Sequence, residues 1–99
     1  MSGAGSEILS EIWSVIEERA INPSEGSYTT KILTHHKGVD KSLEKVGEEC
    51  TEFIIAVKNR DNTRIKEEAA DLIFHLMLAL KGSEVDLSAV FDELASRRH

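Results

Sequence analysis

The sequence predicts an all-α protein, an antiparallel helical bundle. Apolar residues recur three and four positions apart through the long segments of the chain, which places them on one face of a helix. Short runs of helix-breaking residues, such as 22–27 and 60–62, separate these segments. No segment alternates apolar and polar residues as a β-strand does. Because the connection at 60–62 is so short, the helices on either side of it are expected to pack antiparallel.

Capping and breaking residues mark the expected limits of each helix. Helices are predicted over residues 6–21, 41–59, 63–81 and from 87 onward, with an ambiguous, at most short, helix within 28–36. The expected N-caps are Asp40, Asp61 or Asn62, and Asp86. A short polar side chain at the N-cap accepts hydrogen bonds from the free backbone N–H groups of the first turn. Gly38 and Gly82 are expected to end the segments before them.

Length and composition indicate one folded domain over residues 1–99. Charged residues make up 30% and hydrophobic residues 40% of the chain, as in a globular protein. The longest apolar run, 76–80, is too short to cross a bilayer, and no secretory signal is visible, so a cytoplasmic location is expected. The net charge of −6 argues against a nucleic-acid-binding surface, which needs a basic patch. Cys50, the one cysteine, is interpreted as a small core residue.

A single chain of this size is expected to bury only a thin core. Ile55 on the second long helix, and Met77 and Leu78 on the third, lie outside the main apolar stripes of their helices. A partner subunit that completes a four-helix core would cover these side chains. The sequence therefore predicts a homodimer.

Two acidic clusters, within 48–52 and 68–71, are the strongest functional signal in the chain. On the second long helix, one line of side chains at i, i+4, i+7 and i+11 consists of Lys45, Glu49, Glu52 and Ala56. The matching line on the third consists of Arg64, Glu68, Asp71 and His75. Each line follows the edge of an apolar stripe, where two packed helices would bring the carboxylates together. A solvated charged surface would instead lie opposite the core.

Four carboxylates that converge in this way cannot all stay ionised without a cation, because each raises the pKa of the others. Ligands that are all oxygen select hard cations, so Mg²⁺ is expected, with Mn²⁺ as the alternative. The chemistry this suggests is metal-assisted attack of water on a phosphate. The competing interpretation is that each acidic pair is an ordinary surface pair neutralised by nearby Lys or Arg.

Several lysine and histidine residues have two possible roles. The lysines that precede the acidic cluster could hold phosphates or could simply keep the chain soluble: Lys31, Lys37, Lys41 and Lys45. Adjacent His35 and His36 would point in different directions on a helix and are expected in a surface loop. His75 either orients Asp71 through a hydrogen bond or packs half-buried between helices.

The same residues resemble a known family. The segments 26–29 (Gly-Ser-Tyr-Thr), 45–49 (Lys-Val-Gly-Glu-Glu) with Glu52, and 68–76 are similar in order and spacing to phosphoribosyl-ATP pyrophosphohydrolase of histidine biosynthesis. The acidic pattern alone identifies the wider MazG-like group of all-α nucleotide pyrophosphohydrolases. The resemblance implies a dimeric, Mg²⁺-dependent enzyme that hydrolyses phosphoribosyl-ATP to phosphoribosyl-AMP and pyrophosphate.

The resemblance also implies a role for each matching residue. The implied metal ligands are Glu49, Glu52, Glu68 and Asp71. Glu48 would be an outer ligand or would orient the attacking water, which makes the implied catalytic set Glu48, Glu49 and Glu52. The implied contacts to substrate phosphate or ribose are Ser27, Tyr28, Thr29, Lys31 and Lys45. The chain departs from the family pattern at Glu44, where a second lysine is usual, and at Phe74, where tyrosine is common.

Two other functions remain open at this stage. One is a housecleaning pyrophosphatase of the same superfamily that acts on non-canonical nucleoside triphosphates. The other is a non-enzymatic acidic helical dimer that binds a basic partner, which would not explain why the acids flank the core. Release of pyrophosphate from phosphoribosyl-ATP, and its dependence on Mg²⁺, would separate the three.

Overall fold

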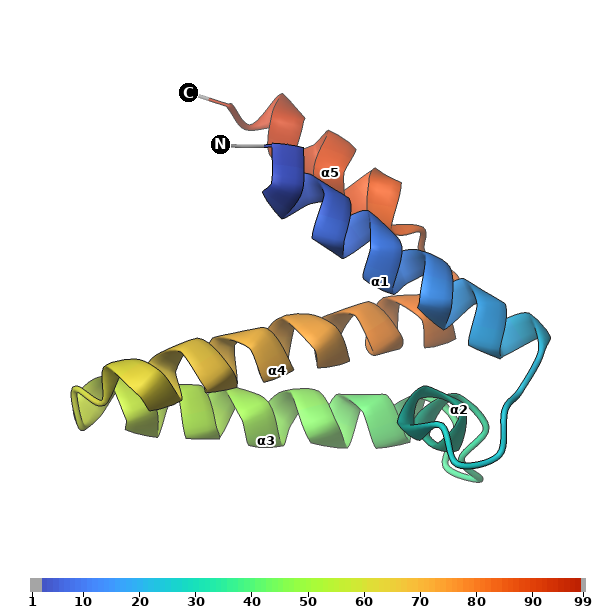
Figure 1. Cartoon of the computed structure of the whole chain (residues 1–99), viewed down its shortest axis with the longest axis horizontal. Coiled ribbons are helices and arrows are strands. Elements are labelled where there is room, and N and C mark those ends of the chain that lie inside the picture. Colours follow the sequence, from blue (N-terminus) through green and yellow to red (C-terminus); the bar gives the residue numbers. More distant parts are fainter. Residues whose placement is uncertain (1–2, 99) are drawn as a thin grey trace.

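The computed structural model describes residues 3–98 and contains five helices and no strand within that range. They are α1 (Gly3–Ile21), α2 (Tyr28–Leu33), α3 (Val39–Lys58), α4 (Asn62–Gly82) and α5 (Leu87–Ser96), shown in Figure 1. The predicted all-α class is confirmed. Each expected helix is present, and the ambiguous segment forms the short helix α2.

Three helices begin at a polar cap whose side-chain oxygen accepts from the first turn. The bonds are Thr30 N to Ser27 Oγ at 3.2 Å, Arg64 N to Asp61 Oδ1 at 3.1 Å and Ser88 N to Asp86 Oδ1 at 2.8 Å. Caps of this kind satisfy backbone donors that a helix leaves unpaired at its start. The predicted caps at Asp61 and Asp86 are confirmed.

The predicted cap at Asp40 is wrong. Helix α3 begins at Val39 and its N-cap is Gly38, so Asp40 lies inside the first turn. Gly38 has a φ of +62°, a left-handed conformation that glycine adopts without the clash of a side chain. Helix α3 can therefore begin at Val39, before the position at which a cap at Asp40 would have started it.

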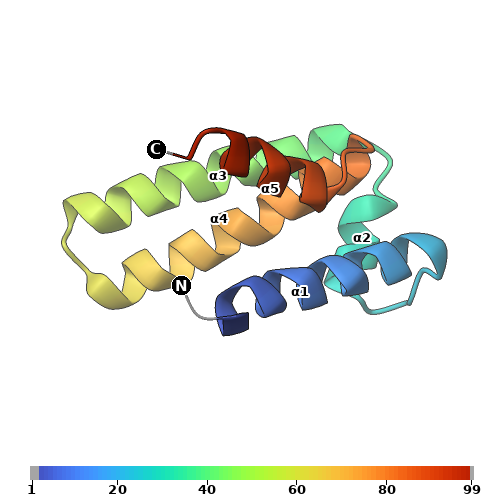
Figure 2. The same cartoon turned by 90° about the horizontal axis from the view of Figure 1, so that it is seen from above.

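Helices α3 and α4 lie side by side and run antiparallel, as the short connection between them predicts (Figures 1 and 2). The buried residues of α3 include Glu49 and Ala56, and those of α4 include Glu68 and His75. All four belong to the two acidic lines of the sequence. The lines therefore face each other across the contact between the helices, and these four members lie deeper than the core edge at which they were expected.

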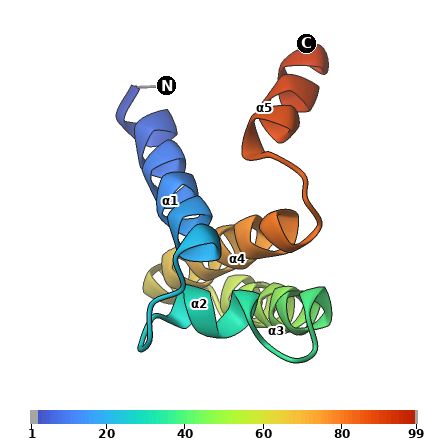
Figure 3. The same ribbon diagram turned by 90° about the vertical axis from the view of Figure 1, so that its right-hand side faces the viewer.

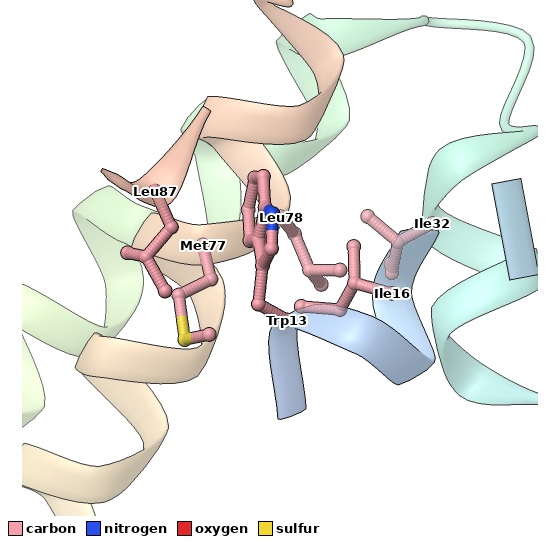
Figure 4. Close-up of a cluster of buried hydrophobic side chains, with 6 residues drawn as sticks. All are labelled: Trp13, Ile16, Ile32, Met77, Leu78 and Leu87. Atoms are coloured by element: carbon pink, nitrogen blue, oxygen red, sulfur yellow. The ribbon is translucent and has the colours of Figure 1, made fainter. Parts of the chain in front are cut away.

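The hydrophobic core lies where α1 crosses α4. Its buried side chains, drawn in Figure 4, are Trp13, Ile16, Ile32, Met77, Leu78 and Leu87. Met77 and Leu78 are 2% and 0% exposed in the single chain, so the prediction that a partner subunit covers them is wrong. The reason is that α1 packs on this face of α4, a long-range contact that helical periodicity does not report.

Other apolar side chains remain exposed in the single chain. Those on α3 are Leu43, Ile54, Ile55 and Val57. Cys50 is half-buried, so it is less enclosed than a core residue. The apolar side chains of α3 stay exposed because the helix directs its acidic line, and not its apolar stripe, toward α4. Within the described residues, no helix combines the length and apolar character needed to span a membrane.

Helices α1 and α5 diverge from the α3–α4 pair on the same side of the molecule (Figure 3). Between α1, α4 and α5 lies an apolar groove of about 470 Å³. Its lining includes Leu9, Ile73, Leu76, Val90, Phe91 and Leu94. Ile73, Leu76 and Leu94 are exposed large apolar side chains, so the groove is an apolar surface that the single chain leaves uncovered.

Candidate active site

Three carboxylates converge between α3 and α4. One oxygen each from Glu49, Glu68 and Asp71 lies within 4.8 Å of the other two. Glu49 and Glu68 are only 7% and 5% exposed, whereas Asp71 is open to solvent. The cluster therefore has a closed floor between the helices and an open side through which a ligand can approach.

Two oxygens at the floor of the cluster have no partner. Glu49 Oε2 and Glu68 Oε2 are buried and accept no hydrogen bond from any residue that the structure describes. The other carboxylate oxygen of Glu68 accepts from Arg64 Nη2 at 2.9 Å. A buried acceptor without a donor costs about 1–3 kcal/mol, and more when it is charged. A cation between these carboxylates would remove that cost.

The electrostatics of the cluster support the same conclusion. Burial, together with interactions with Glu52, Glu68 and Asp71, raises the pKa of Glu49 from 4.5 to about 7. Burial also raises the pKa of Glu68, with Glu52 adding to the effect. The two buried glutamates are therefore harder to ionise than free carboxyl groups, and a positive ion beside them would favour their ionised forms.

The donor set suits a hard divalent cation. Every side chain in the cluster offers carboxylate oxygen, the ligand that Mg²⁺ and Mn²⁺ prefer over nitrogen or sulfur. Of the four ligands implied by the sequence, the structure brings Glu49, Glu68 and Asp71 together. Glu52 is exposed and lies outside this group of three, yet close enough to raise the pKa of both buried glutamates.

Glu48 and Lys45 form a separate pair beside the cluster. Lys45 Nζ lies 2.9 Å from Glu48 Oε2, and this hydrogen bond lowers the pKa of the Glu48 carboxyl. Glu48 is exposed, so it stays ionised and in contact with water. The structure therefore separates Glu48 from the buried acids, in agreement with its position around the helix from Glu49.

His75 links α4 to α2 at the edge of the cluster. It is 6% exposed, and its Nε2 lies 2.8 Å from the Tyr28 hydroxyl. Its Nδ1 lies 2.8 Å from the backbone carbonyl oxygen of Asp71, not from the carboxylate that the sequence suggested. The Tyr28–His75 pair was missed in the sequence because the two residues are 47 positions apart.

The other implied substrate contacts sit on or before α2. Ser27 caps this helix, Thr29 is buried beneath it, and Lys31 is exposed on it. His35 and His36 follow in a loop, with ring centroids 4.4 Å apart, which confirms the expectation of a loop. Tyr28, the first residue of α2, is joined to α4 by its hydrogen bond with His75.

Buried, unpartnered carboxylates between two antiparallel helices define a class: an all-α protein whose acidic cluster offers the ligand oxygens that a divalent cation prefers. The family model described as phosphoribosyl-ATP pyrophosphohydrolase matches residues 9–98. The chain therefore belongs to the phosphoribosyl-ATP pyrophosphohydrolase family, and the resemblance seen in the sequence is confirmed.

Individual relatives agree with this assignment. A Methanosphaerula palustris protein named phosphoribosyl-ATP pyrophosphatase is 60% identical over 91 residues, which cover 92% of each chain. A protein of the same name from Methanoculleus marisnigri is also 60% identical over 91 residues, covering 92% of this chain and 94% of its own. Another of that name from Methanococcoides burtonii is 44% identical over 99 residues, covering 100% of both. These similarities extend over almost the whole chain.

Proposed function

We propose that this chain hydrolyses phosphoribosyl-ATP to phosphoribosyl-AMP and pyrophosphate in histidine biosynthesis, using Mg²⁺ held by its acidic cluster. The observation that carries the mechanism is the pair of buried, unpartnered oxygens of Glu49 and Glu68. Family membership supports the reaction and the substrate. The acidic cluster supports the need for a divalent cation, because an uncompensated group of carboxylates would repel a triphosphate.

Glu49, Glu68 and Asp71 are proposed to hold the cation, with Glu52 as a fourth carboxylate at the open side. When bound, a divalent cation would neutralise the polyphosphate and acidify a water molecule for attack. We take this cation to be Mg²⁺, with Mn²⁺ as the alternative, because both accept all-oxygen ligands and bind phosphates. Arg64 keeps Glu68 in place by binding its second oxygen.

Glu48 and Lys45 act beside the cluster in this proposal. Glu48 remains ionised and exposed, so it can accept a hydrogen bond from the attacking water and orient it toward the phosphorus. Lys45 brings positive charge to the same side, where negative charge develops on the phosphoryl oxygens. The water oxygen forms a new bond to phosphorus as the bond between the α- and β-phosphates breaks, the proton that water loses passes to solvent, and phosphoribosyl-AMP and pyrophosphate are released.

The substrate is tested by measuring pyrophosphate release from phosphoribosyl-ATP, free ATP and a panel of non-canonical nucleoside triphosphates. We expect release from phosphoribosyl-ATP only, and only when Mg²⁺ is present. Preferential hydrolysis of the non-canonical triphosphates would instead establish the housecleaning alternative. Absence of any Mg²⁺-dependent turnover would leave the acidic helical module as the remaining interpretation.

A homodimer is part of the proposal, with the apolar groove between α1, α4 and α5 as its contact surface. Leu94 lines this groove and is exposed in the single chain, so the Leu94→Glu variant should keep its fold but lose the apolar contact. We expect light scattering to report twice the 11.0 kDa chain mass for the original protein and a monomer for this variant. Ile21→Glu, at an exposed site outside the groove, is the matched control. A monomeric original protein would contradict the proposal.

The domain organisation, cellular location and partners of the chain are part of the same proposal. The family match over 9–98 supports one domain that makes up the chain. We place its activity in the cytoplasm, where nucleotide substrates for biosynthesis are found. The net charge of −6 supports the absence of a nucleic-acid partner, because a long polyanion would be repelled by the surface as a whole.

A further inference from the structure

Tyr28, His75 and the backbone of Asp71 form a continuous hydrogen-bonded chain. The Tyr28 hydroxyl and His75 Nε2 are 2.8 Å apart, and His75 Nδ1 and the Asp71 carbonyl oxygen are also 2.8 Å apart. The tyrosine ring is further held by the Phe74 ring, with centroids 6.2 Å apart, and meets the His75 ring edge-on at 5.7 Å. These contacts hold the phenol in one place relative to α4.

The direction of each hydrogen bond follows from the end of the chain. A backbone carbonyl oxygen can only accept, so His75 Nδ1 carries a proton and donates it to Asp71. In a neutral imidazole the other nitrogen has no proton, so Nε2 accepts from the Tyr28 hydroxyl. A phenol has a single proton, which is now engaged. The oxygen of Tyr28 is left with accepting capacity only.

The Tyr28 hydroxyl also lies within the electrostatic field of the acidic cluster. Burial raises the pKa of this hydroxyl, Lys45 lowers it, and the carboxylates of Glu49, Glu48 and Asp71 raise it. The hydroxyl therefore stays protonated, consistent with its role as the donor to His75. The tyrosine side chain is nevertheless partly exposed, so a ligand that occupies the site can reach its oxygen.

We propose that Tyr28 accepts a hydrogen bond from a ribose hydroxyl of the substrate, and that His75 is a positioning residue that holds Tyr28 as an acceptor. An ionised phosphate offers only acceptors, so it cannot bind an oxygen that also only accepts. A sugar hydroxyl supplies the missing donor. The inference rests on the proposed function and narrows the role of Tyr28 from phosphate or ribose to ribose alone.

The ribose concerned is the one that carries the triphosphate. The carboxylates of Glu49 and Asp71 act electrostatically on the Tyr28 hydroxyl, so this hydroxyl lies near the acidic cluster, where the phosphoanhydride would be cleaved. The sugar attached to the α-phosphate is the sugar nearest to that bond. Its 2′ and 3′ hydroxyls are the candidate donors.

The test compares phosphoribosyl-ATP with its 2′-deoxy and 3′-deoxy analogues on the triphosphate-bearing ribose. Loss of one neutral hydrogen bond of about 1–1.4 kcal/mol corresponds to about a fivefold to tenfold change in kcat/KM. We expect this loss for one deoxy analogue with the original protein, and for Tyr28→Phe with phosphoribosyl-ATP, mostly through KM. Tyr28→Phe should lose nothing further with that analogue, because the bond is already absent.

Two further sets of variants check the role of His75 and the specificity of the effect. The shorter amide of His75→Asn can still donate to the Asp71 carbonyl but places no group where Nε2 was, so this variant should discriminate less against the deoxy sugar. The longer amide of His75→Gln can accept from Tyr28 and should restore it. Lys31→Gln is the control, because Lys31 is exposed and a charge contact to phosphate there would affect phosphoribosyl-ATP and its analogues alike.

The outcomes separate this inference from the proposed function. If the original protein releases pyrophosphate but Tyr28→Phe loses the same factor with all three substrates, or loses none, the ribose contact is overturned and the enzyme assignment stands. If the original protein does not hydrolyse phosphoribosyl-ATP, the proposed function and the ribose contact are both overturned. Because Tyr28 is partly exposed and the change removes one oxygen, thermal melting should confirm that Tyr28→Phe remains folded.

Discussion

Glutamine in place of Glu49 is expected to reduce Mg²⁺-dependent pyrophosphate release by a factor on the order of 10²–10³ or more. The substitution keeps the size of the side chain but removes one negative charge from the floor of the site, where Glu49 Oε2 has no protein partner. Asp71→Asn should have a similar effect, because Asp71 supplies the solvent-facing oxygen of the same group of three. The measurement is kcat/KM for phosphoribosyl-ATP at several Mg²⁺ concentrations.

A loss of activity is informative only if the variants remain folded. Glu49→Gln should be at least as heat-stable as the original protein without metal, because it relieves a buried charge whose pKa is raised to about 7. It should also gain less stability from added Mg²⁺. Glu67→Gln, an exposed neighbour of Glu68, serves as the matched control and should retain activity. Near-full activity of Glu49→Gln or Asp71→Asn would show that the metal assignment is wrong.

The metal-free protein is expected to lose stability through Glu49 as the pH rises from about 4.5 to about 7. Burial and the neighbouring acids raise the pKa of Glu49 from 4.5 to about 7, so in this range the folded state binds more protons than the unfolded state. Stability then falls with increasing pH. Saturating Mg²⁺ should reverse this dependence, since a cation favours the ionised carboxylates, and should raise the melting temperature more at pH 8 than at pH 5.

The contribution of Glu49 is isolated by comparing the original protein with Glu49→Gln across pH 5–8. His35 has a pKa lowered from 6.5 by desolvation and by His36 and the nearby lysines, so its contribution to stability rises with pH and opposes that of Glu49. Asp86 has a lowered pKa and acts only in more acidic solution. Without metal, the difference in melting temperature between the two proteins should change with pH, because only the original protein carries the ionisable Glu49. A constant difference would contradict the raised pKa.

The spacing of the acidic residues allowed much of the site to be predicted. Glu68 and Asp71 are three residues apart on one helix, and Glu49 lies on the other, so helical geometry alone places them on two matching lines. The three-residue turn then makes the helices antiparallel and brings the lines together. What the spacing could not show is their depth: Glu49 and Glu68 are enclosed in the contact between α3 and α4, which is why two of their oxygens have no partner.

Local sequence signals thus account for the helices, most of their caps and the candidate metal ligands, because these depend on periodicity and on residues a few positions apart. They failed for Met77 and Leu78, which were assigned to a subunit contact and instead lie in the core of one chain. They also could not reveal the bond between Tyr28 and His75, which joins residues 47 positions apart. Both depend on how α1 and α2 pack on α4, and the free energy of that packing comes from side chains distant in sequence. The acidic pattern in the sequence therefore predicts the candidate cation ligands, whereas the packing of the helices determines that Tyr28 is the side chain placed to contact the ribose.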